Sequence, residues 1–381
     1  MRHFYEFFAG GGMVRAGLGP QWQCLFANDF DHKKSRIYRE NWGDAELKTA
    51  DVASLTLDDL PGLAHLAWAS FPCQDLSLAG GGAGLKGERS GTYRPFWALM
   101  KSLIAGGRPP QIIAIENVCG TLTSHGGKDF VTICRGFVEA GYSVGAMVID
   151  AVRFVPQSRP RLFVIGIREG VSIPDNVVSP APLLHWHTKG LQTAYAKLSA
   201  SVRNKWIWWN LPLPDTRTLT LSDVVEDSPL ATEWFSDAET EQLLAMMSDL
   251  NRTKLEEAQQ IGRRIVGGVY KRTRRDEFGG RLQRAEIRFD DIAGCLRTPI
   301  GGSSRQVVVA VNGPVVRARL ISSRETARLM GLPDSYILPV NYNEAYHLTG
   351  DGVVVPVVRH LAEHIFEPIL NCEKQHQSIA A

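Results

Sequence analysis

Residues 3–19 read HFYEFFAGGGMVRAGLG, and this stretch decides the expected fold. A short apolar run ends in Gly10–Gly12, as a buried strand would. Met13, Ala16 and Gly17 then follow at helical spacing. A strand that turns through glycines into a helix lets a ligand approach the backbone and its exposed N–H groups. Taken alone, the turn fits a nucleotide-type site and ordinary turn chemistry equally well.

Further apolar runs alternate with helical segments up to residue 168. The runs that read as strands are WQCLFAND (22–29), AHLAWAS (64–70), QIIAIEN (111–117) and RLFVIGI (161–167). The segments that read as helices are DHKKSRIYREN (31–41) and FVTICRGFVEAGY (130–142). The runs at 64–70 and 111–117 show no alternation of apolar and polar residues, so both faces of the strands should be covered. The pattern predicts an α/β fold with a mostly parallel sheet.

The composition changes near residue 170. Residues 174–232 are rich in Pro, Trp and polar turns, and residues 237–261 look helical. Between residues 252 and 288, eleven Lys or Arg stand against five Asp or Glu, whereas the whole chain of 381 residues has a net charge of +2. This predicts a local basic surface, and the α/β character returns from about residue 310. We therefore expect three parts, which are a catalytic and cofactor-binding domain at 1–168, an inserted target-binding domain at 169–305, and a return to the catalytic domain at 306–381.

The cysteines and the N-terminal sequence limit the classes to which the protein could belong. No two of the six cysteines form a CxxC pair, which argues against a zinc knuckle or a dithiol redox site. They are Cys24, Cys73, Cys119, Cys134, Cys295 and Cys372. We expect no metal. No apolar run approaches a membrane span and no signal peptide is visible, so we expect a cytoplasmic protein with reduced thiols and no membrane partner.

Acidic side chains follow two of the strand-like runs. Asp29 ends the second run, where a carboxylate can accept hydrogen bonds from ribose hydroxyls. A helix cap is the alternative, although Asp31 is the better cap for the helix that follows. Asp51 comes after the next short segment and could accept a proton from an adenine amino group. Another cap or turn explains Asp51 equally well.

Residues 69–85 read ASFPCQDLSLAGGGAGL and place Cys73 at the carboxyl end of a strand, where α/β sheets bind their ligands. Pro72 stiffens the step before the cysteine, and Gln74 and Ser77 add polar groups. The glycines from Gly80 to Gly87 predict a flap that can close. The alternative is a buried structural thiol, as most cysteines are.

Two later motifs add an acid and two cations. Glu116 of ENV ends another apolar strand, where desolvation could keep it protonated as a general acid; a surface Glu at a loop start is the alternative. In QSRPR, Gln157, Arg159 and Arg161 alternate, so the arginines should point to one side and bind an anion or a carbonyl. Solvated arginines on an edge strand are the alternative.

These motifs in this order resemble the C5-cytosine DNA methyltransferase family over nearly the whole chain. The matching stretches are FFAGGG, NDFD, DV, FPCQDLS, ENV, QSRPR, LRTPIGGSSRQVV and YHLTGDGVVVPVVRHLAEHI. The resemblance implies a Rossmann-like, doubly wound methyltransferase sheet with an inserted target-recognition domain. It also implies S-adenosylmethionine as methyl donor, with S-adenosylhomocysteine as product, and double-stranded DNA as substrate. The basic segment lies where the resemblance places target recognition.

The resemblance also assigns roles to residues. Cys73 would add as a thiolate to C6 of a cytosine flipped out of the duplex, which activates C5 for methylation. Glu116 would hold or protonate N3, Arg159 and Arg161 would lower the pKa of the thiol, and Arg161 would contact O2. The expected cofactor residues are Phe8, Gly10, Gly12, Asp29, Phe30, Asp51, Val52, Pro72 and Asp351. The expected DNA contacts are Gln74, Ser77, Gln157 and Arg297.

Two positions depart from the family pattern, and other functions remain open. Asp351 stands where the family usually has Asn, and Tyr93 where it usually has Leu. A tRNA cytosine methyltransferase is the first alternative, although the long insertion favours DNA. A nucleotide-binding oxidoreductase and a non-catalytic DNA-binding relative are the others. We expect a monomer in the bacterial cytoplasm or nucleoid, either solitary or with a cognate restriction endonuclease.

Overall fold

The computed structural model describes residues 1–72, 90–229, 232–275, 279–297 and 305–372. The expected nucleophile Cys73, its neighbours Gln74 and Ser77, and the expected flap Gly80–Gly87 lie outside the described residues. The chain forms two compact units. Unit 1 comprises Met1–Asp150, Pro160–Pro214 and Val353–Ala381, and unit 2 comprises Ala151–Arg159 and Asp215–Gly352.

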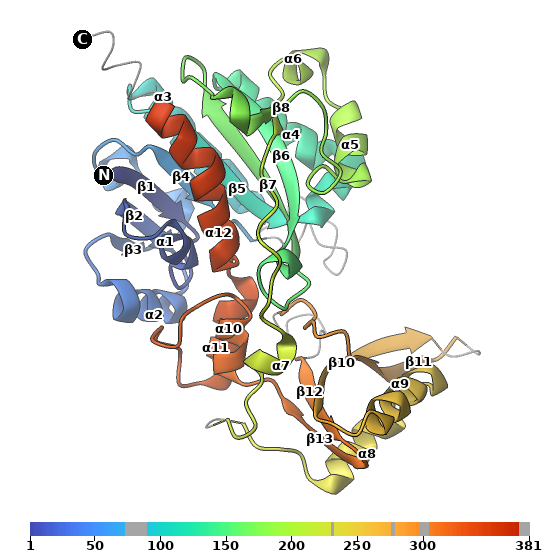
Figure 1. Ribbon diagram of the computed structural model, residues 1–381. Helices are drawn as coiled ribbons and strands as arrows, with labels where there is room; N and C mark the ends of the chain where they lie inside the picture. Colours follow the sequence, from blue (N-terminus) through green and yellow to red (C-terminus); the bar gives the residue numbers. More distant parts are fainter. Residues whose placement is uncertain (73–89, 230–231, 276–278, 298–304, 373–381) are drawn as a thin grey trace. The chain divides into compact units, whose positions relative to one another are not determined.

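A seven-stranded sheet forms the centre of unit 1, with the strand order β3-β2-β1-β4-β5-β7-β6 (Figure 1). The strands are β1 (Arg2–Phe7), β2 (Trp22–Asp29), β3 (Leu47–Thr49), β4 (Leu66–Ala69), β5 (Ile112–Val118), β6 (Tyr142–Asp150) and β7 (Pro160–Arg168). The strands from β3 to β5 pair in parallel, whereas β7 runs antiparallel to both β5 and β6. The predicted α/β class and mostly parallel sheet are confirmed, but the sequence analysis missed β6.

Helices cover both faces of this sheet because its strands are apolar on both sides. Side chains alternate along β1, so Tyr5 and Phe7 point to one face and Phe4 to the other. The ring of Phe7 lies 5.1 Å from that of Phe96 in α3, which places α3 on the first face. The helices of unit 1 are α1 (Met13–Leu18), α2 (His32–Trp42), α3 (Tyr93–Ala105), α4 (Lys128–Glu139), α5 (Lys189–Ala196), α6 (Ala200–Arg203) and α12 (Val355–Leu361).

The C-terminal helix α12 joins the N-terminal helix α1 at a glycine. A Cβ on Gly17 would lie 2.5 Å from the Val358 Cβ, so only glycine lets the two helices approach this closely. After α12 the chain makes a π-helical turn, Ala362–Phe366. Its Phe366 ring lies 6.3 Å from Trp68 in β4, edge to face. Residues more than 300 positions from the N-terminus thereby complete the core under β1 and β4.

Residues 175–214 belong to unit 1, although the sequence analysis placed the domain change at 169. The short strand β9 (Trp208–Trp209) pairs with β8 (Val178–Ser179), and Ile207 donates a backbone hydrogen bond to Val144 of β6. Trp206 packs on Phe130 of α4 at 6.2 Å between ring centroids. The tryptophans of this polar, Pro-rich stretch therefore extend the core of unit 1, because each buries a large apolar surface.

Unit 2 is built on a four-stranded antiparallel sheet in the order β11-β10-β12-β13 (Figure 1). Its strands are β10 (Ile265–Arg275), β11 (Arg281–Arg288), β12 (Val307–Asn312) and β13 (Val315–Leu320). Its helices are α7 (Leu221–Val224), α8 (Asp237–Ala245), α9 (Asp249–Gln260), α10 (Ser323–Arg328) and α11 (Tyr342–Asp351). The stretch 237–261 forms two helices, because Ser236 and Ser248 each begin a separate one. β12 and β13 pair with β10, so residues 306–352 fold with unit 2, whereas the sequence analysis assigned them to the catalytic domain.

Apolar side chains of α8 and α9 cover one face of this sheet. The buried cluster contains Leu243, Met247 and Leu255 from the helical segment, and Val269, Val309 and Ala318 from the strands. The fully buried Arg319 of β13 and Glu325 of α10 form an ion pair of 2.6 Å between Nη2 and Oε1. The paired charges satisfy each other away from water. No helix within the described parts of the chain is long and apolar enough to cross a membrane.

Candidate functional site

The strands β1, β2, β4 and β5 end at one edge of the sheet of unit 1, because they run parallel. Asp29 is the last residue of β2, and Glu116 lies near the end of β5. The Gly-rich turn follows β1, and Pro72 comes three residues after β4. β7 runs the opposite way, so its first residues reach the same edge, and Arg161 pairs in register with Val118. The sheet therefore gathers the expected cofactor residues of unit 1 and two expected catalytic residues.

The Gly-rich turn needs a left-handed backbone at three positions. Phe8, Gly10 and Gly12 have φ values of 57°, 55° and 77°. A Cβ on Gly12 would lie 2.4 Å from Nε1 of Trp42, which donates a hydrogen bond to the Gly11 carbonyl at 2.9 Å. Trp42 is the last residue of α2, and its ring supports the backbone of the turn. The sequence analysis missed Trp42, because nothing in the spacing of α2 shows that this ring faces the turn.

Asp29 binds the turn itself in this structure. One carboxylate oxygen accepts from Gly10 N at 2.8 Å, and the other accepts from Asp31 N at 2.8 Å. Burial raises the pKa of Asp29. Asp31 caps α2 by accepting from Lys33 N and Lys34 N, as the sequence favoured. The neighbouring Phe30 leaves 67% of its surface exposed, which offers an apolar ring at the strand end to a flat ligand.

Asp51 and Val52 lie where the segment after β3 reaches the same edge. Asp51 is exposed and caps a short helical turn by accepting from Ala53 N at 2.8 Å, so the capping alternative is present in the structure. Val52 is buried. The amide of Asn28, at the end of β2, donates to the carbonyls of Lys48 and Ala50 at 3.0 and 2.8 Å. Asn28 thereby fixes the path of the chain into Asp51.

Glu6 is a buried carboxylate behind the Gly-rich turn that the sequence analysis also missed. It is 1% exposed, and its Oε1 accepts from Val14 N at the start of α1 at 3.3 Å. Burial raises the pKa of Glu6 to about 8, against the opposing effects of the Val14 N–H and Arg15. A glutamate inside an otherwise apolar strand was the available signal. Glu6 thereby ties the start of α1 to the end of β1.

Replacing Glu6 by Gln should flatten the pH dependence of stability. The unfolded chain loses the Glu6 proton near the ordinary pKa of 4.5, whereas the folded chain keeps it up to about 8. Between these values the folded state holds one more proton, so raising the pH lowers the free energy of unfolding by up to about 1.4 kcal/mol per unit. Urea unfolding at pH 5 to 8.5 measures this slope. A Glu6→Gln protein with the wild-type slope would contradict the assignment.

Glu116 and Arg161 form an ion pair at the end of β5. Arg161 Nε lies 3.2 Å from Glu116 Oε1, and the two side chains are 16% and 8% exposed. The predicted acid and one predicted cation are therefore neighbours. Cys119 comes three residues after Glu116. Burial raises the pKa of its thiol to about 11, although the positive charge of Arg161 acts to lower it. This thiol stays protonated at neutral pH, so it is a poor nucleophile.

Asn117, between Glu116 and Val118 in ENV, holds the chain just before Cys73. Its Nδ2 donates to the Phe71 carbonyl at 3.1 Å, and its Oδ1 accepts from Val118 N at 2.8 Å. Phe71 is the second residue before the expected nucleophile. Asn117 at β5 thus repeats what Asn28 does at β2, since each ties a strand end to the loop beside it. The sequence analysis quoted Asn117 but gave it no role.

Gln157 and Arg159 have structural roles within unit 2. Gln157 is fully buried, donates to the Leu329 carbonyl at 2.8 Å and accepts from Leu296 N at 3.1 Å. Arg159 is 2% exposed and donates to the carbonyls of Leu296, Gly350 and Gly352 at 3.0, 2.8 and 2.8 Å. Gln157 was expected to contact DNA, and in this structure its amide is buried within the protein. Arg159, which was expected to be catalytic, holds the 296 and 350–352 segments in this structure.

The other expected residues are found as follows. Pro72 is half-buried at the end of β4, next to the buried Phe71. Arg297 is exposed at the border of the described residues, and Asp351 is exposed at the end of α11. Tyr93, where the family usually has Leu, stacks on Trp97 at 5.9 Å and lies 5.5 Å from Phe71 between ring centroids. Its ring therefore packs behind the strand that leads to Cys73.

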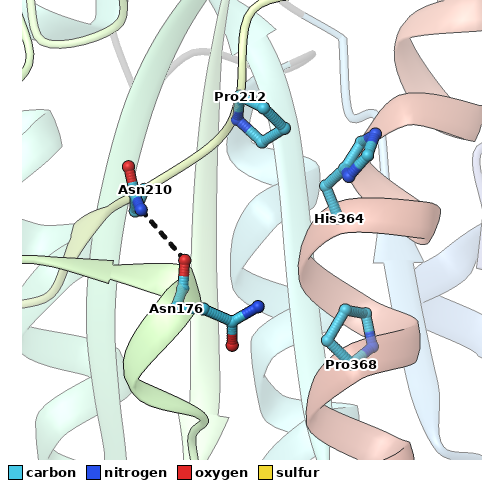
Figure 2. Close-up of a pocket in the computed structure, with 5 residues that line it drawn as sticks. All are labelled: Asn176, Asn210, Pro212, His364 and Pro368. Carbon is cyan, nitrogen blue, oxygen red and sulfur yellow. Dashed lines mark hydrogen bonds between the residues drawn. The ribbon is translucent and has the colours of Figure 1, made fainter.

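A separate pocket of about 270 Å³ lies in unit 1, away from these residues. Figure 2 shows its lining, which comes from the 208–212 segment, Asn176 and the C-terminal helical segment. Asn210 donates to the Asn176 carbonyl at 3.0 Å, and His364 and Pro368 face them. None of the residues expected from the sequence lines it. Groups of three or more His, Cys, Asp or Glu able to hold a metal are absent from the described residues.

The strand order separates this sheet from that of the oxidoreductase alternative. The doubly wound dinucleotide fold has six parallel strands in the order 3-2-1-4-5-6. Here the antiparallel β7 lies between β5 and β6. That insertion brings Arg161 to the carboxyl edge, which a parallel strand at this place would not do.

Known proteins with similar sequences or folds are methyltransferases. The family model described as C-5 cytosine-specific DNA methylase matches residues 2–367. The Type II methyltransferase M.Bsp6I of Bacillus sp. (strain RFL6) is 24% identical over 97% of this chain and 100% of its own. M.DsaV of Dactylococcopsis salina, also a Type II methyltransferase, is 26% identical over 98% of this chain and 88% of its own.

A solved structure agrees on the fold. The Entamoeba histolytica methyltransferase EhMeth has a TM-score of 0.65 at 14% identity, covering 96% of this chain and 98% of that one. The family match spans both units, from the Gly-rich turn to the C-terminal helix. The chain therefore belongs to the C-5 cytosine-specific DNA methylase family, which confirms the prediction made from the order of its motifs.

Proposed function

We propose that this protein transfers a methyl group from S-adenosylmethionine to C5 of a cytosine in a specific duplex DNA sequence. The observation that carries the proposal is the pairing of Glu116 with Arg161 at the carboxyl edge, 3.2 Å apart and nearly buried. Asn117, next to Glu116 in the chain, donates a hydrogen bond to the Phe71 carbonyl. Phe71 stands two residues before Cys73, the cysteine of the PCQ motif. The proposal assigns Cys73 as the nucleophile, Glu116 as the acid and Arg161 as the cation.

The residues present fit a nucleoside cofactor. Phe30 offers an exposed ring to a base, and Asp29 and Asp51 offer carboxylates beside it. The left-handed turn at Phe8, Gly10 and Gly12 brings backbone close to the same edge. Val52, Pro72 and Asp351 complete the proposed cofactor set. S-adenosylmethionine, when bound, supplies the methyl group and leaves as S-adenosylhomocysteine; no metal enters the proposal.

The roles of the chain's own residues follow from the chemistry of cytosine. C5 is a weak nucleophile until a thiolate adds to C6, so Cys73 forms a C–S bond there and electron density moves to C5. Glu116 protonates or holds N3, which takes up the displaced charge. Arg161 keeps Glu116 in place and offers its guanidinium to O2 of the base. After methylation a water molecule takes the C5 proton, the C–H electrons form the C5–C6 double bond, and Cys73 leaves as a thiolate. The proton on N3 returns to Glu116.

Access to C6 requires the cytosine to leave the duplex, which costs a few kcal/mol. Contacts from Gln74, Ser77 and Arg297 to phosphate or sugar are the proposed compensation. The protein acts as a monomer in the bacterial cytoplasm or nucleoid in this proposal. A cognate restriction endonuclease of the same specificity is the proposed biological partner, since methylation of the shared site blocks cleavage.

The test measures methyl transfer from labelled S-adenosylmethionine to duplex DNA and, in parallel, to total tRNA. Label in DNA, at one sequence found by bisulfite sequencing, supports the proposal. Label in tRNA alone would establish the tRNA alternative instead. A duplex with 5-fluorocytosine at the target should stay covalently attached to the protein, because the fluorine cannot leave as a proton does.

A further inference from the structure

We propose that the two-stranded ribbon formed by β10 and β11 is the sequence-reading element of unit 2 and binds the major groove of DNA. This inference rests on the proposed function and names the surface that selects the target. β12 pairs with β10 only from Ile265 to Val269. Beyond that point β10 pairs with β11 alone, from Tyr270 opposite Glu286 to Arg275 opposite Arg281.

The ribbon carries a dense positive charge. Seven Lys or Arg and one Glu occur among its residues 271–275 and 281–288. Two pairs of arginines stand directly across the strands, Arg272 opposite Arg284 and Arg275 opposite Arg281. Like charges opposite each other in a sheet destabilise it. A polyanion bound along the ribbon would relieve this repulsion, and the chain as a whole has a net charge of only +2.

The two faces of the ribbon differ. Opposite residues of an antiparallel pair share a face, so Tyr270, Arg272, Arg274, Leu282 and Arg284 lie on one side. Val269 and Ala285 lie on the other, where they join the core under α8 and α9. Arg272, Arg274 and Leu282 are exposed. The Tyr270 hydroxyl on the first side donates to Cys295 and Gln306, so this side is an open face only beyond Tyr270, where it combines arginines with Leu282.

One carboxylate orients two of the open-face arginines. Glu286 stands opposite Tyr270, and its Oε2 lies 3.2 Å from Arg272 Nε. Arg274 Nε donates to the other oxygen, Oε1, at 2.7 Å. A guanidinium held by a fixed partner loses less freedom on binding. Arg272 and Arg274 are therefore presented in a defined direction, as bidentate recognition of a base requires.

These features match one form of DNA recognition. The major groove admits a two-stranded β-ribbon, and an arginine that donates two hydrogen bonds to guanine is the commonest specific contact there. Arg272 and Arg274 suit base edges, and the exposed Leu282 suits the methyl group of thymine. Arg275 and Arg281, at the far end of the ribbon, suit phosphates. The ribbon thus holds both specifying and positioning groups.

The experiment measures DNA affinity with S-adenosylhomocysteine present, at several salt concentrations. The probes are two duplexes, one with the sequence that the wild-type protein methylates and one without it. Arg281→Ala should weaken both equally, by roughly three- to tenfold, and lower the salt slope by about 1. Arg274→Ala should weaken mainly the cognate duplex, by about tenfold. Arg274→Lys keeps the charge and should still lose discrimination, because lysine cannot form the fork.

The Glu286→Gln variant tests whether Glu286 acts by orienting Arg272 and Arg274 or only by lowering the positive charge of the ribbon. Removing the carboxylate makes the ribbon more positive, so binding to the non-cognate duplex should tighten. The ratio of cognate to non-cognate affinity should fall by roughly tenfold, since Arg272 and Arg274 lose their partner. Unchanged discrimination in Glu286→Gln would overturn the orienting role.

Arg135→Ala is the matched control, an exposed arginine of α4 in unit 1 whose side chain is 61% exposed. The ribbon inference fails if Arg274→Ala and Arg281→Ala behave like Arg135→Ala while the wild-type protein methylates DNA. In that case the proposed function stands and another surface reads the target. If the wild-type protein methylates no DNA, the proposed function itself fails.

Discussion

Cys73→Ser should lower methyl transfer by on the order of 10³-fold or more while binding of S-adenosylhomocysteine stays within about twofold. A serine hydroxyl is almost fully protonated at neutral pH and cannot supply the thiolate that adds to C6. Apart from Pro72, the proposed cofactor residues lie away from this strand end, so most of the cofactor contacts should survive the change. Single-turnover methylation of the target duplex measures the first effect, and calorimetric titration measures the second.

Cys119→Ser is the control for this result, because Cys119 follows Glu116 by three residues and its thiol feels the charges of both Glu116 and Arg161. Its thiol has a pKa raised to about 11 by burial, so it should not act as a nucleophile. We expect near wild-type turnover and retained trapping of a 5-fluorocytosine duplex. Turnover that survives in Cys73→Ser but is lost in Cys119→Ser would reassign the nucleophile.

Glu116→Gln should lower kcat by on the order of 10²-fold or more, because the amide cannot give a proton to N3. The neutral side chain also leaves Arg161 without the carboxylate that lies 3.2 Å from its Nε. The affinity for S-adenosylhomocysteine should change little. Steady-state kinetics on the target duplex, with kcat and KM reported separately, distinguish a chemical role from a binding role.

Glu139→Gln is the matched control, since Glu139 makes an exposed ion pair with Arg135 on α4. Exposed pairs contribute little, so this variant should keep wild-type kcat. A Glu116→Gln protein that raises KM tenfold at an unchanged kcat would show that Glu116 binds the base without taking part in the proton transfer.

Short motifs predicted much of unit 1 because their chemistry is local. The Gly-rich turn needs left-handed backbone at Gly10 and Gly12, which side chains disfavour, so the glycines mark it. Apolar runs predicted β1, β2, β4, β5 and β7. Because parallel strands end at the same edge of a sheet, the residues at these ends were expected to lie together. β6, with the sequence YSVGAMVID, was missed because the amphipathic pattern before it was extended to Tyr142.

The division into units was less predictable from the sequence. Residues 175–214 are polar and rich in proline, yet Trp209 is buried in unit 1 and the partly buried Trp206 packs on its core. Residues 306–352 read as α/β, yet β12 and β13 complete the sheet of unit 2. A strand pattern shows that a segment pairs with something, and it does not show which strand lies beside it.

By itself, the sequence determined the family, the α/β class and the residues that carry the expected chemistry, because each motif is a property of a few adjacent positions. Only the tertiary structure decided which side chains meet. It paired Glu116 with Arg161, buried Gln157 and Arg159 among backbone carbonyls, placed Trp42 and Glu6 on the Gly-rich turn, and aligned arginines across β10 and β11. These contacts join positions distant in the chain, and their geometry comes from packing and strand register, which no local pattern encodes.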